Sequence, residues 1–269
     1  MSAAPVLFIS HGAPTFALEP GVLGANLVAI APRVGEVAAV LVVSAHWQTR
    51  DVRVMTTGLP ETIHDFRGFA PELYRLEYPA PGAPELAAQA HRLLSDSGFT
   101  ASLDDRRGLD HGAWVPMLHL FPSARVPMFQ VSMPFELDTA VAWRLGRALA
   151  PIRDHGVLIV GSGSLTHNLY EVRQKGMGTA SYAREFAGWV REAVLARDTD
   201  KLIRYRRIAP HAERAHPTEE HYLPLLVALG ASAGSAAPAE VIEGGMTFGV
   251  LSMESYAWGL PEPGAAKSS

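Results

Sequence analysis

Three short apolar runs in this chain are each followed closely by a histidine. His11 follows the run at residues 6–9, His46 follows residues 40–43, and His167 follows residues 157–160. Continuous apolar runs of this length, bounded by Gly, Ser and Pro, predict buried strands of a parallel sheet. The carboxyl ends of parallel strands meet at one edge, where open α/β sheets bind their ligands. The pattern therefore predicts one site that the three histidines share.

The rest of the chain alternates between strand and helix patterns. We expect helices at 21–30, 84–94, 138–150, 181–196 and 222–229, and further strands at 52–56, 126–131 and 247–253. Pro32 is expected to close the first helix. This alternation predicts a single α/β domain with a mixed or mostly parallel central sheet flanked by helices. Residues 1–260 form that catalytic domain in this interpretation, and residues 261–269 form a frayed C-terminal tail.

The charge and hydrophobicity of the chain restrict the kinds of molecule that it is expected to bind. The chain has 269 residues, a net charge of −4 and no basic stripe, so nucleic acid and anionic membrane surfaces are not expected partners. No apolar run approaches the ~20 residues that cross a bilayer, and the N-terminus lacks a secretion signal. We therefore expect a cytoplasmic protein that acts on a small molecule. Whether subunits form a homo-oligomer is left open by the sequence.

The absence of cysteine excludes disulfides, thiolate nucleophiles and thiolate metal ligands. A bound metal must then be held by nitrogen and oxygen, and neutral imidazole is a common ligand of Fe(II) and Zn(II). His11 and His46 suit strand-end ligands, and residues 216–221 offer two histidines and two carboxylates for a third. The alternative interpretation is that these histidines bond to turns and that His216 caps a helix.

Six blocks of sequence carry a resemblance to a known family. They are Ser10-His11-Gly12-Ala13-Pro14, Ser44-Ala45-His46-Trp47, Ile63-His64-Asp65-Phe66, Asp110-His111-Gly112-Ala113-Trp114, Thr166-His167-Asn168-Leu169 and Glu220-His221-Tyr222-Leu223-Pro224-Leu225. Together they resemble the DOPA 4,5-dioxygenase type of extradiol ring-cleaving dioxygenase, a branch of the class III, protocatechuate 4,5-dioxygenase β-subunit-like superfamily. The resemblance runs from about residue 6 to about residue 253.

The resemblance implies residue roles and cofactors. It makes His11, His46 and His221 the metal ligands, and it puts His167 beside the metal as an acid/base or a fourth ligand. It places His111 in the substrate pocket. It implies Fe(II) for activity, with Zn(II) possible in the same site, and a catechol such as DOPA or a related compound as the substrate that reacts with O2.

Aromatic residues near these blocks suit the wall of a pocket for a catechol ring. We expect substrate contacts from His64, Trp47, Phe66 and Trp114, with ordinary core packing as the alternative for the aromatic side chains. Two other functions stay open on the residues alone. One is a zinc hydrolase in which Glu219 or Glu220 activates water, and the other is a non-enzymatic, metal-binding interaction protein on the same fold.

Overall fold

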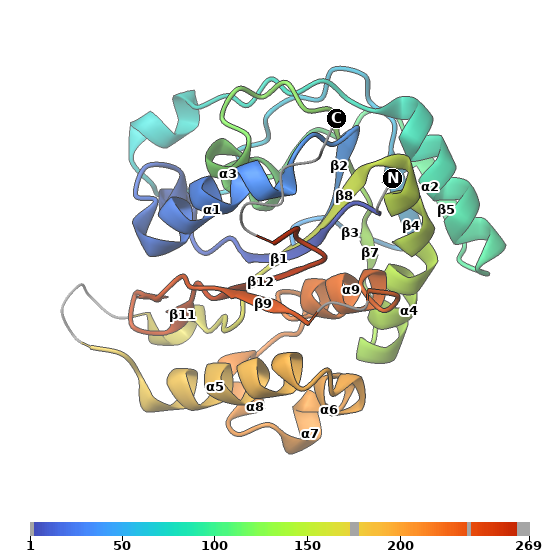
Figure 1. Ribbon diagram of the computed structural model, residues 1–269. Coiled ribbons are helices and arrows are strands. Elements are labelled where there is room, and N and C mark those ends of the chain that lie inside the picture. Colours follow the sequence, from blue (N-terminus) through green and yellow to red (C-terminus); the bar gives the residue numbers. More distant parts are fainter. Residues whose placement is uncertain (1–2, 173–177, 236–237, 263–269) are drawn as a thin grey trace.

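The computed structural model describes residues 3–172, 178–235 and 238–262, and a six-stranded sheet lies at its centre (Figure 1). The strand order is β6-β2-β8-β1-β12-β9. These strands are β1 (Val6–Ser10), β2 (Ala39–Ser44), β6 (Met128–Gln130), β8 (Val157–Gly163), β9 (Glu240–Ile242) and β12 (Ser255–Trp258). The first four strands in this order run parallel to one another. At one edge of the sheet, β12 pairs antiparallel with β1, and β9 pairs antiparallel with β12. The predicted fold class, an α/β domain with a mostly parallel sheet, is confirmed.

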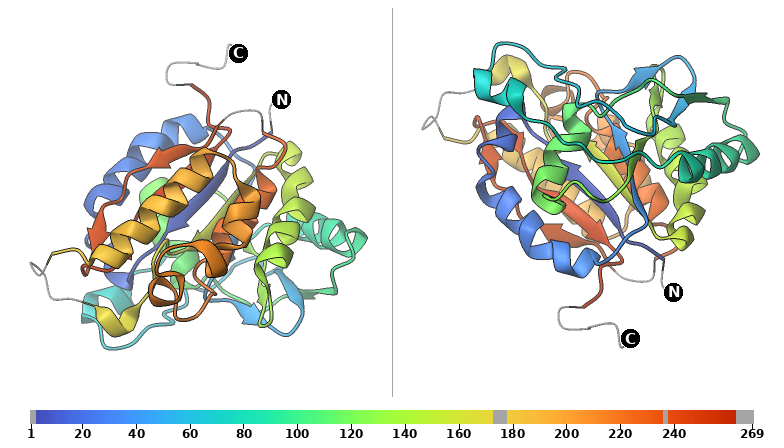
Figure 2. Two further views of the ribbon diagram at one scale, coloured as in Figure 1. Left: turned by 90° about the horizontal axis from the view of Figure 1, so that it is seen from below. Right: turned by 90° about the horizontal axis from the view of Figure 1, so that it is seen from above.

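Helices cover both faces of this sheet. The longer ones are α1 (Gly21–Val34), α2 (Pro84–Asp96), α3 (His111–Leu120), α4 (Thr139–Leu149), α5 (Ser181–Leu195) and α9 (Leu223–Ala231). Seen from above, α1 and α3 lie over the sheet, and seen from below, α5 lies over the opposite face (Figure 2). Short helices α6 (Thr199–Ile203), α7 (Tyr205–Ile208) and α8 (Ala212–Ala215) join α5 to α9. In the part of the chain that is described, no helix has the length and apolarity needed to cross a membrane.

Small elements complete the layers. They are β3 (Gln48–Thr49) with β7 (Met133–Pro134), β4 (Val52–Met55) with β5 (Ala101–Asp104), β10 (Met246–Thr247) with β11 (Leu251–Ser252), and the 3-10 turns η1 (Pro14–Ala17), η2 (Pro71–Arg75), η3 (Ala150–His155) and η4 (Leu169–Glu171).

Strands β1, β2 and β8 are buried along their whole length, which explains why they read as unbroken apolar runs. Their register aligns Ser10 with Gly163 and Ser44 with Ser162. The three strands therefore end at the same edge of the sheet, on the left in Figure 1. The segments that follow the three strands therefore start close to one another.

Two expectations about elements were wrong. The stretch 247–253 is not one strand, because positive φ angles at Phe248 and Gly249 turn the chain between β10 and β11. The last strand of the sheet is instead β12. The first helix continues past residue 30 to Val34, with Pro32 inside its last turn. Of the predicted tail 261–269, residues 263–269 lie outside the described residues, and Pro261 and Glu262 are exposed.

Candidate metal centre

Four of the predicted site histidines converge at the carboxyl edge of the sheet. The ring of His11 lies 4.9 Å from that of His46, 5.4 Å from that of His221 and 5.3 Å from that of His111, measured between centroids. One nitrogen from each of His11, His46 and His221 lies within 4.8 Å of the other two. Segments that are distant in sequence thus supply a compact group with the spacing of metal ligands.

The local fold explains how these side chains reach the same point. His11 follows β1 directly, and His46 follows β2 by two residues. His221 precedes α9, and this helix start lies directly on β8, because a Cβ at Gly163 would come within 2.2 Å of the His221 carbonyl oxygen. Gly161 and Gly163 therefore let the end of β8 pack directly against the start of α9.

Oxygen atoms behind the rings fix which nitrogen of His11 and His221 carries a proton. Ser162 donates its hydroxyl to the Gly112 carbonyl, so it must accept the bond from Nδ1 of His11 at 2.9 Å. The Glu220 carboxylate accepts from Nδ1 of His221 at 3.0 Å. In both rings the proton is on Nδ1, and the lone pair of Nε2 points into the cluster.

His46 is held in the same way by Asp65. Its Nδ1 lies 3.6 Å from Oδ2 of Asp65, which favours the proton on that nitrogen. Nε2 of His46 then faces Nε2 of His11 at only 2.9 Å. Two lone pairs at this distance repel each other unless a cation lies between or beside them.

The protonation of the cluster favours a metal ion over a shared proton. Burial, with neighbouring histidines, lowers the pKa of His11 and of His221 well below the usual value, and burial lowers the pKa of His46 to about 4. At neutral pH the rings are therefore uncharged. Nε2 of His221 is buried without a hydrogen-bond partner among the described residues. Three neutral imidazoles, one of them with an orphaned nitrogen, fit a divalent cation.

His167 and His111 flank this group. The His167 ring is stacked on that of His221, with centroids 3.5 Å apart and planes 9° apart, and burial lowers its pKa. The His111 ring lies 4.0 Å from that of His46. Asp65 accepts hydrogen bonds from both the backbone N–H and Nδ1 of His111, each at 2.9 Å.

The start of α3 positions His111. Asp110 caps this helix by accepting the N–H of Ala113, and it also accepts the Ser44 hydroxyl at 2.6 Å. Gly112 leaves room for this approach, because a Cβ there would lie 2.5 Å from the Ser44 hydroxyl oxygen and 3.1 Å from a ring carbon of His46. Residues 110–112 therefore attach the start of α3 to the end of β2.

Of the four residues predicted to contact the substrate, only some lie next to the histidine cluster. Phe66 packs edge-on against both His111 and His64, at 5.7 Å in each case. Nε2 of His64 bonds to the Leu76 carbonyl. Trp114 is fully buried and donates its indole N–H to the Ile63 carbonyl. Trp47 is 5% exposed and lies beneath the guanidinium of Arg107.

Sequence reasoning missed three residues that hold the histidines, namely Asp65, Ser162 and Glu220. Asp65 and Glu220 each stand directly before or after a histidine in a recognised block, which is the signal that could have found them. His216, the alternative third ligand, is buried elsewhere, and its Nε2 bonds to the Leu165 carbonyl.

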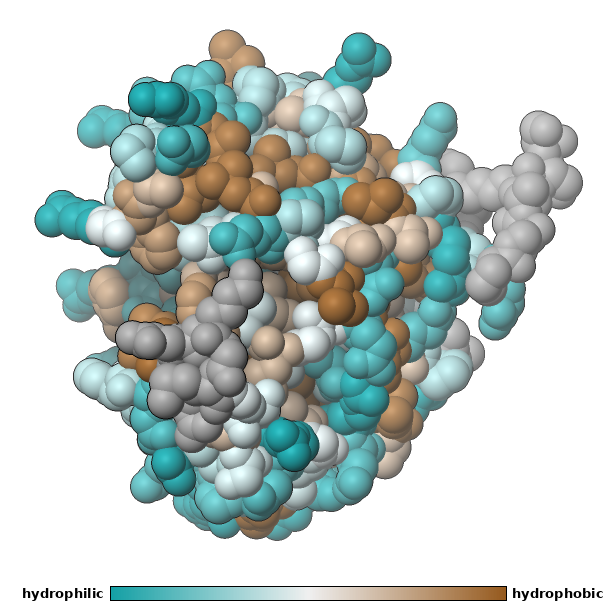
Figure 3. Space-filling model, turned by 90° about the vertical axis from the view of Figure 1, so that its left-hand side faces the viewer, coloured by the Kyte–Doolittle hydropathy of each residue, from teal (hydrophilic) through white to brown (hydrophobic). Residues whose placement is uncertain are grey.

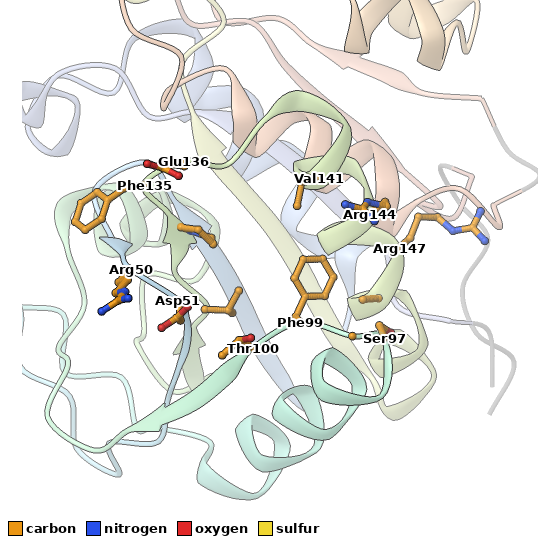
Figure 4. A pocket seen from close by; sticks show the side chains of 14 residues that line it. Arg50, Asp51, Ser97, Phe99, Thr100, Phe135, Glu136, Val141, Arg144 and Arg147 are labelled. Atoms are coloured by element: carbon orange, nitrogen blue, oxygen red, sulfur yellow. The ribbon is translucent and has the colours of Figure 1, made fainter.

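A cavity of about 920 Å³ lies between the segment that follows α2 and helix α4 (Figure 4). Arg50 and Phe135 lie at one side of it, and Phe99 points towards Val141 at the other. None of the predicted site residues lines this cavity. It is separate from the histidine cluster.

Comparison with known proteins agrees with this geometry. The family model described as the catalytic LigB subunit of aromatic ring-opening dioxygenase matches residues 7–258. The chain belongs to the LigB family. This match spans all four histidines of the convergent group and His167, and it confirms the resemblance found in the sequence.

Named relatives in the LigB family cover nearly the whole chain. A 4,5-DOPA dioxygenase extradiol of Beta vulgaris is 41% identical over 93% of this chain and 94% of its own length. A protein of the same name in Escherichia coli K12 is 36% identical over 93% of each chain. The crystal structure of an uncharacterised Escherichia coli K12 protein superposes with a TM-score of 0.78 at 32% identity, covering 95% of this chain and all of that one. The chain therefore belongs to a family of aromatic ring-opening dioxygenases, and the two relatives named here are extradiol enzymes by name.

Proposed function

We propose that this protein opens a catechol-type aromatic ring with O2 at a divalent metal held by His11, His46 and His221. The observation that supports this most strongly is the convergence of three Nε2 lone pairs, whose orientation Ser162, Asp65 and Glu220 impose. A bound metal would supply the Lewis-acid and redox chemistry that activates the catechol and O2. Fe(II) is the expected cofactor because ring opening needs redox chemistry, and Zn(II) fits the same three imidazoles.

His167 is the proposed base for the catechol hydroxyl. Its pKa is lowered by burial, so the ring is neutral and able to accept a proton at neutral pH. The parallel stack on His221 holds it beside the proposed metal ligands. Its nitrogen atoms are not part of the group that His11, His46 and His221 form, although His167, Glu220 and His221 form a second close group, and we assign His167 the acid/base role on the first of these observations.

His111 is the proposed donor to the substrate or to the oxygen that is inserted. Asp65 accepts a hydrogen bond from Nδ1–H of His111, which leaves Nε2 as the nitrogen available to the reacting atoms. Burial raises the pKa of Asp65, but the hydrogen bonds from His111 and the electrostatic interactions with His111 and His46 together outweigh it and lower that pKa to about 2, so the carboxylate stays charged.

Phe66 and His64 are the proposed ring contacts of the substrate. Phe66 touches the ring of His111, and His64 lies behind it, so the two residues suit the wall nearest to the reacting atoms. The burial of Trp114 and Trp47 supports a role in holding the loops that carry the histidines.

The zinc hydrolase alternative needs a carboxylate free to activate water. Glu219 accepts the hydroxyl of Tyr205 at 2.8 Å, and Glu220 is bonded to His221 and Thr218. Both carboxylates are engaged in holding other side chains, which speaks against this alternative.

Anaerobic reconstitution with Fe(II) and with Zn(II), followed by oxygen-uptake assays on a panel of catechols, tests the proposal. We expect one O2 consumed per ring opened with Fe(II) and none with Zn(II). Metal-loaded protein that consumes no O2 with any catechol, or that hydrolyses its substrate without O2, would contradict the dioxygenase proposal.

A further inference from the structure

A second cavity, of about 680 Å³, lies beside the segment that follows His11. Its walls are formed by η1, the first turn of α1 and the β10–β11 hairpin. Lining side chains include Ala13, Phe16, Val22, Val172, Phe248 and Met253. Figure 3 looks onto this side of the molecule and shows hydrophobic side chains gathered across the upper half of the face.

The cavity lies next to the segment that presents His11. Ala13 is two residues from His11, so their Cα atoms are at most about 7.6 Å apart. Gly12 adopts a φ of +62°, and a Cβ there would lie 2.5 Å from the sulfur of Met253. Met253 thus packs directly against the backbone that presents His11, and it lines the cavity as well. On another side, Val172 follows His167 by five residues.

The chemistry of the walls is apolar. Among the described residues that line the cavity, Glu19 is the one ionisable side chain, and no cation is present. A carboxylate placed there would lose water without gaining a positively charged partner among these residues, which is unfavourable. The volume is within the range of small-molecule sites, and apolar walls favour burial of hydrocarbon.

We propose that this cavity receives the ring substituent of the catechol, and that the preferred substituent is apolar and uncharged. The inference rests on the proposed function, because it takes the ring itself to lie at the histidine cluster. The cavity thereby restricts the substrate class further than the requirement for a catechol ring alone. Alkyl catechols are preferred over catechols that carry a carboxylate, DOPA included.

The test uses two measurements on the Fe(II)-loaded protein. The first is anaerobic equilibrium binding of 4-butylcatechol, unsubstituted catechol, 3,4-dihydroxyphenylpropionate and DOPA. The second is the ratio of kcat/KM for 4-butylcatechol to that for catechol. We expect 4-butylcatechol to bind at least about tenfold more tightly than the other three, since burying each methylene is favourable.

Val22→Trp fills the cavity from α1, and Thr247→Trp fills it from β10. Either change should lower the butylcatechol-to-catechol ratio at least about fivefold, as the substituent loses its space. Val28→Trp is the matched control. Val22 and Val28 are 54% and 58% exposed on the same helix, and Val28 does not line the cavity.

The outcomes separate this inference from the proposed function. Tighter binding of DOPA or of the propionate than of 4-butylcatechol would overturn the inference, as would an unchanged ratio in both filling variants. Neither result affects the dioxygenase proposal, which depends on O2 uptake. Conversely, selective butylcatechol binding that Val22→Trp abolishes would support the cavity assignment even if no catechol were cleaved.

Discussion

At the scale of single residues, the cluster is defined by the oxygen atoms behind the histidines as much as by the rings. Ser162, Asp65 and Glu220 each face an Nδ1 atom, so the Nε2 atoms are turned inwards. Such partners typically change metal affinity or activity by about 10–100-fold when they are removed. The sequence pattern suggests His11 and His46 as ligands and the family resemblance adds His221, whereas the protonation of the three rings follows from these oxygen partners.

Asp65→Asn tests one of these oxygen partners. The amide keeps the shape of the side chain but removes the charge that faces His46 and His111. We expect kcat to fall by about 10–100-fold and metal affinity to fall in the same range, with little change in folding. Wild-type kcat and wild-type metal affinity in this variant would show that the carboxylate does not position either ring. Asp51→Asn, at an exposed carboxylate, is the control.

His167→Ala separates the two roles left open for that residue. If His167 is the base, the variant should bind the metal at close to one per chain while kcat drops by about 10²–10⁴-fold. Metal analysis and oxygen uptake on the same preparation measure both quantities. Loss of the metal would make His167 a ligand, and full turnover would remove it from the reaction.

The imidazoles could be found in the sequence because each follows a strand end or precedes a helix within a recognisable block. Their partners could not, since a hydrogen bond between residues 11 and 162, or 65 and 111, depends on how separate segments pack. The surroundings of the aromatic residues could not be predicted from the sequence for the same reason. Phe66 and Trp114 look alike in the sequence, yet one borders His111 and the other is fully buried.

At the scale of elements, close contacts between α4 and α9 fix where His221 lies. A Cβ at Gly146 would come within 2.0 Å of the Val227 carbonyl oxygen, and one at Gly230 within 2.0 Å of the Trp143 carbonyl oxygen. The two helices therefore pack backbone against backbone at these glycines. Because α9 begins two residues after His221, any shift of α9 moves a proposed ligand.

Gly146→Ala should destabilise the protein by about 1–3 kcal/mol, because a methyl group cannot share this space with backbone atoms. The matched control is Gly188→Ala in the interior of α5, where an added Cβ meets nothing within 4 Å. That change should stabilise the protein by about 0.5–1 kcal/mol through helix propensity. Chemical denaturation of both variants measures the difference, and equal effects would argue against the close contact.

His216 makes stability depend on pH. Burial lowers its pKa from 6.5 to about 3, so in the folded protein the ring stays neutral while the unfolded chain takes up a proton below pH 6.5. Its contribution is complete above pH 6.5 and is lost as the pH falls, by up to about 1.4 kcal/mol per pH unit. In metal-free protein, His216→Gln should lose stability less steeply between pH 6.5 and 4.5 than the wild type. Parallel curves would show that His216 is not the group responsible.

Most elements could be predicted from the sequence, because buried parallel strands and amphipathic helices have strong periodic patterns. The antiparallel edge could not. Strand β12 has only four residues, and the longer apolar stretch before it competes as a strand until the turn at Phe248 and Gly249 is known. Strand β9 is shorter still and follows a segment rich in small residues. Pairing with β1 and β12, rather than local preference, makes these two segments strands.

At the scale of the whole molecule, the sheet topology accounts for the site. Parallel strands β1, β8 and β2 end together, helix α3 closes over one side, and α9 approaches from the other. Two cavities flank this arrangement, and only the apolar one borders the segment after His11. The central claim is that three histidines from distant segments hold a single divalent ion.

Equilibrium dialysis of the metal-free protein against Zn(II), a redox-inert probe, tests that claim without any assay of activity. The account predicts one Zn(II) per chain for the wild type and for His155→Ala, an exposed histidine at the end of η3 that precedes β8 and lies outside the group of three. It predicts affinity at least on the order of 100-fold weaker for His221→Ala, which removes one of three ligands. Wild-type affinity in His221→Ala would contradict the three-histidine centre.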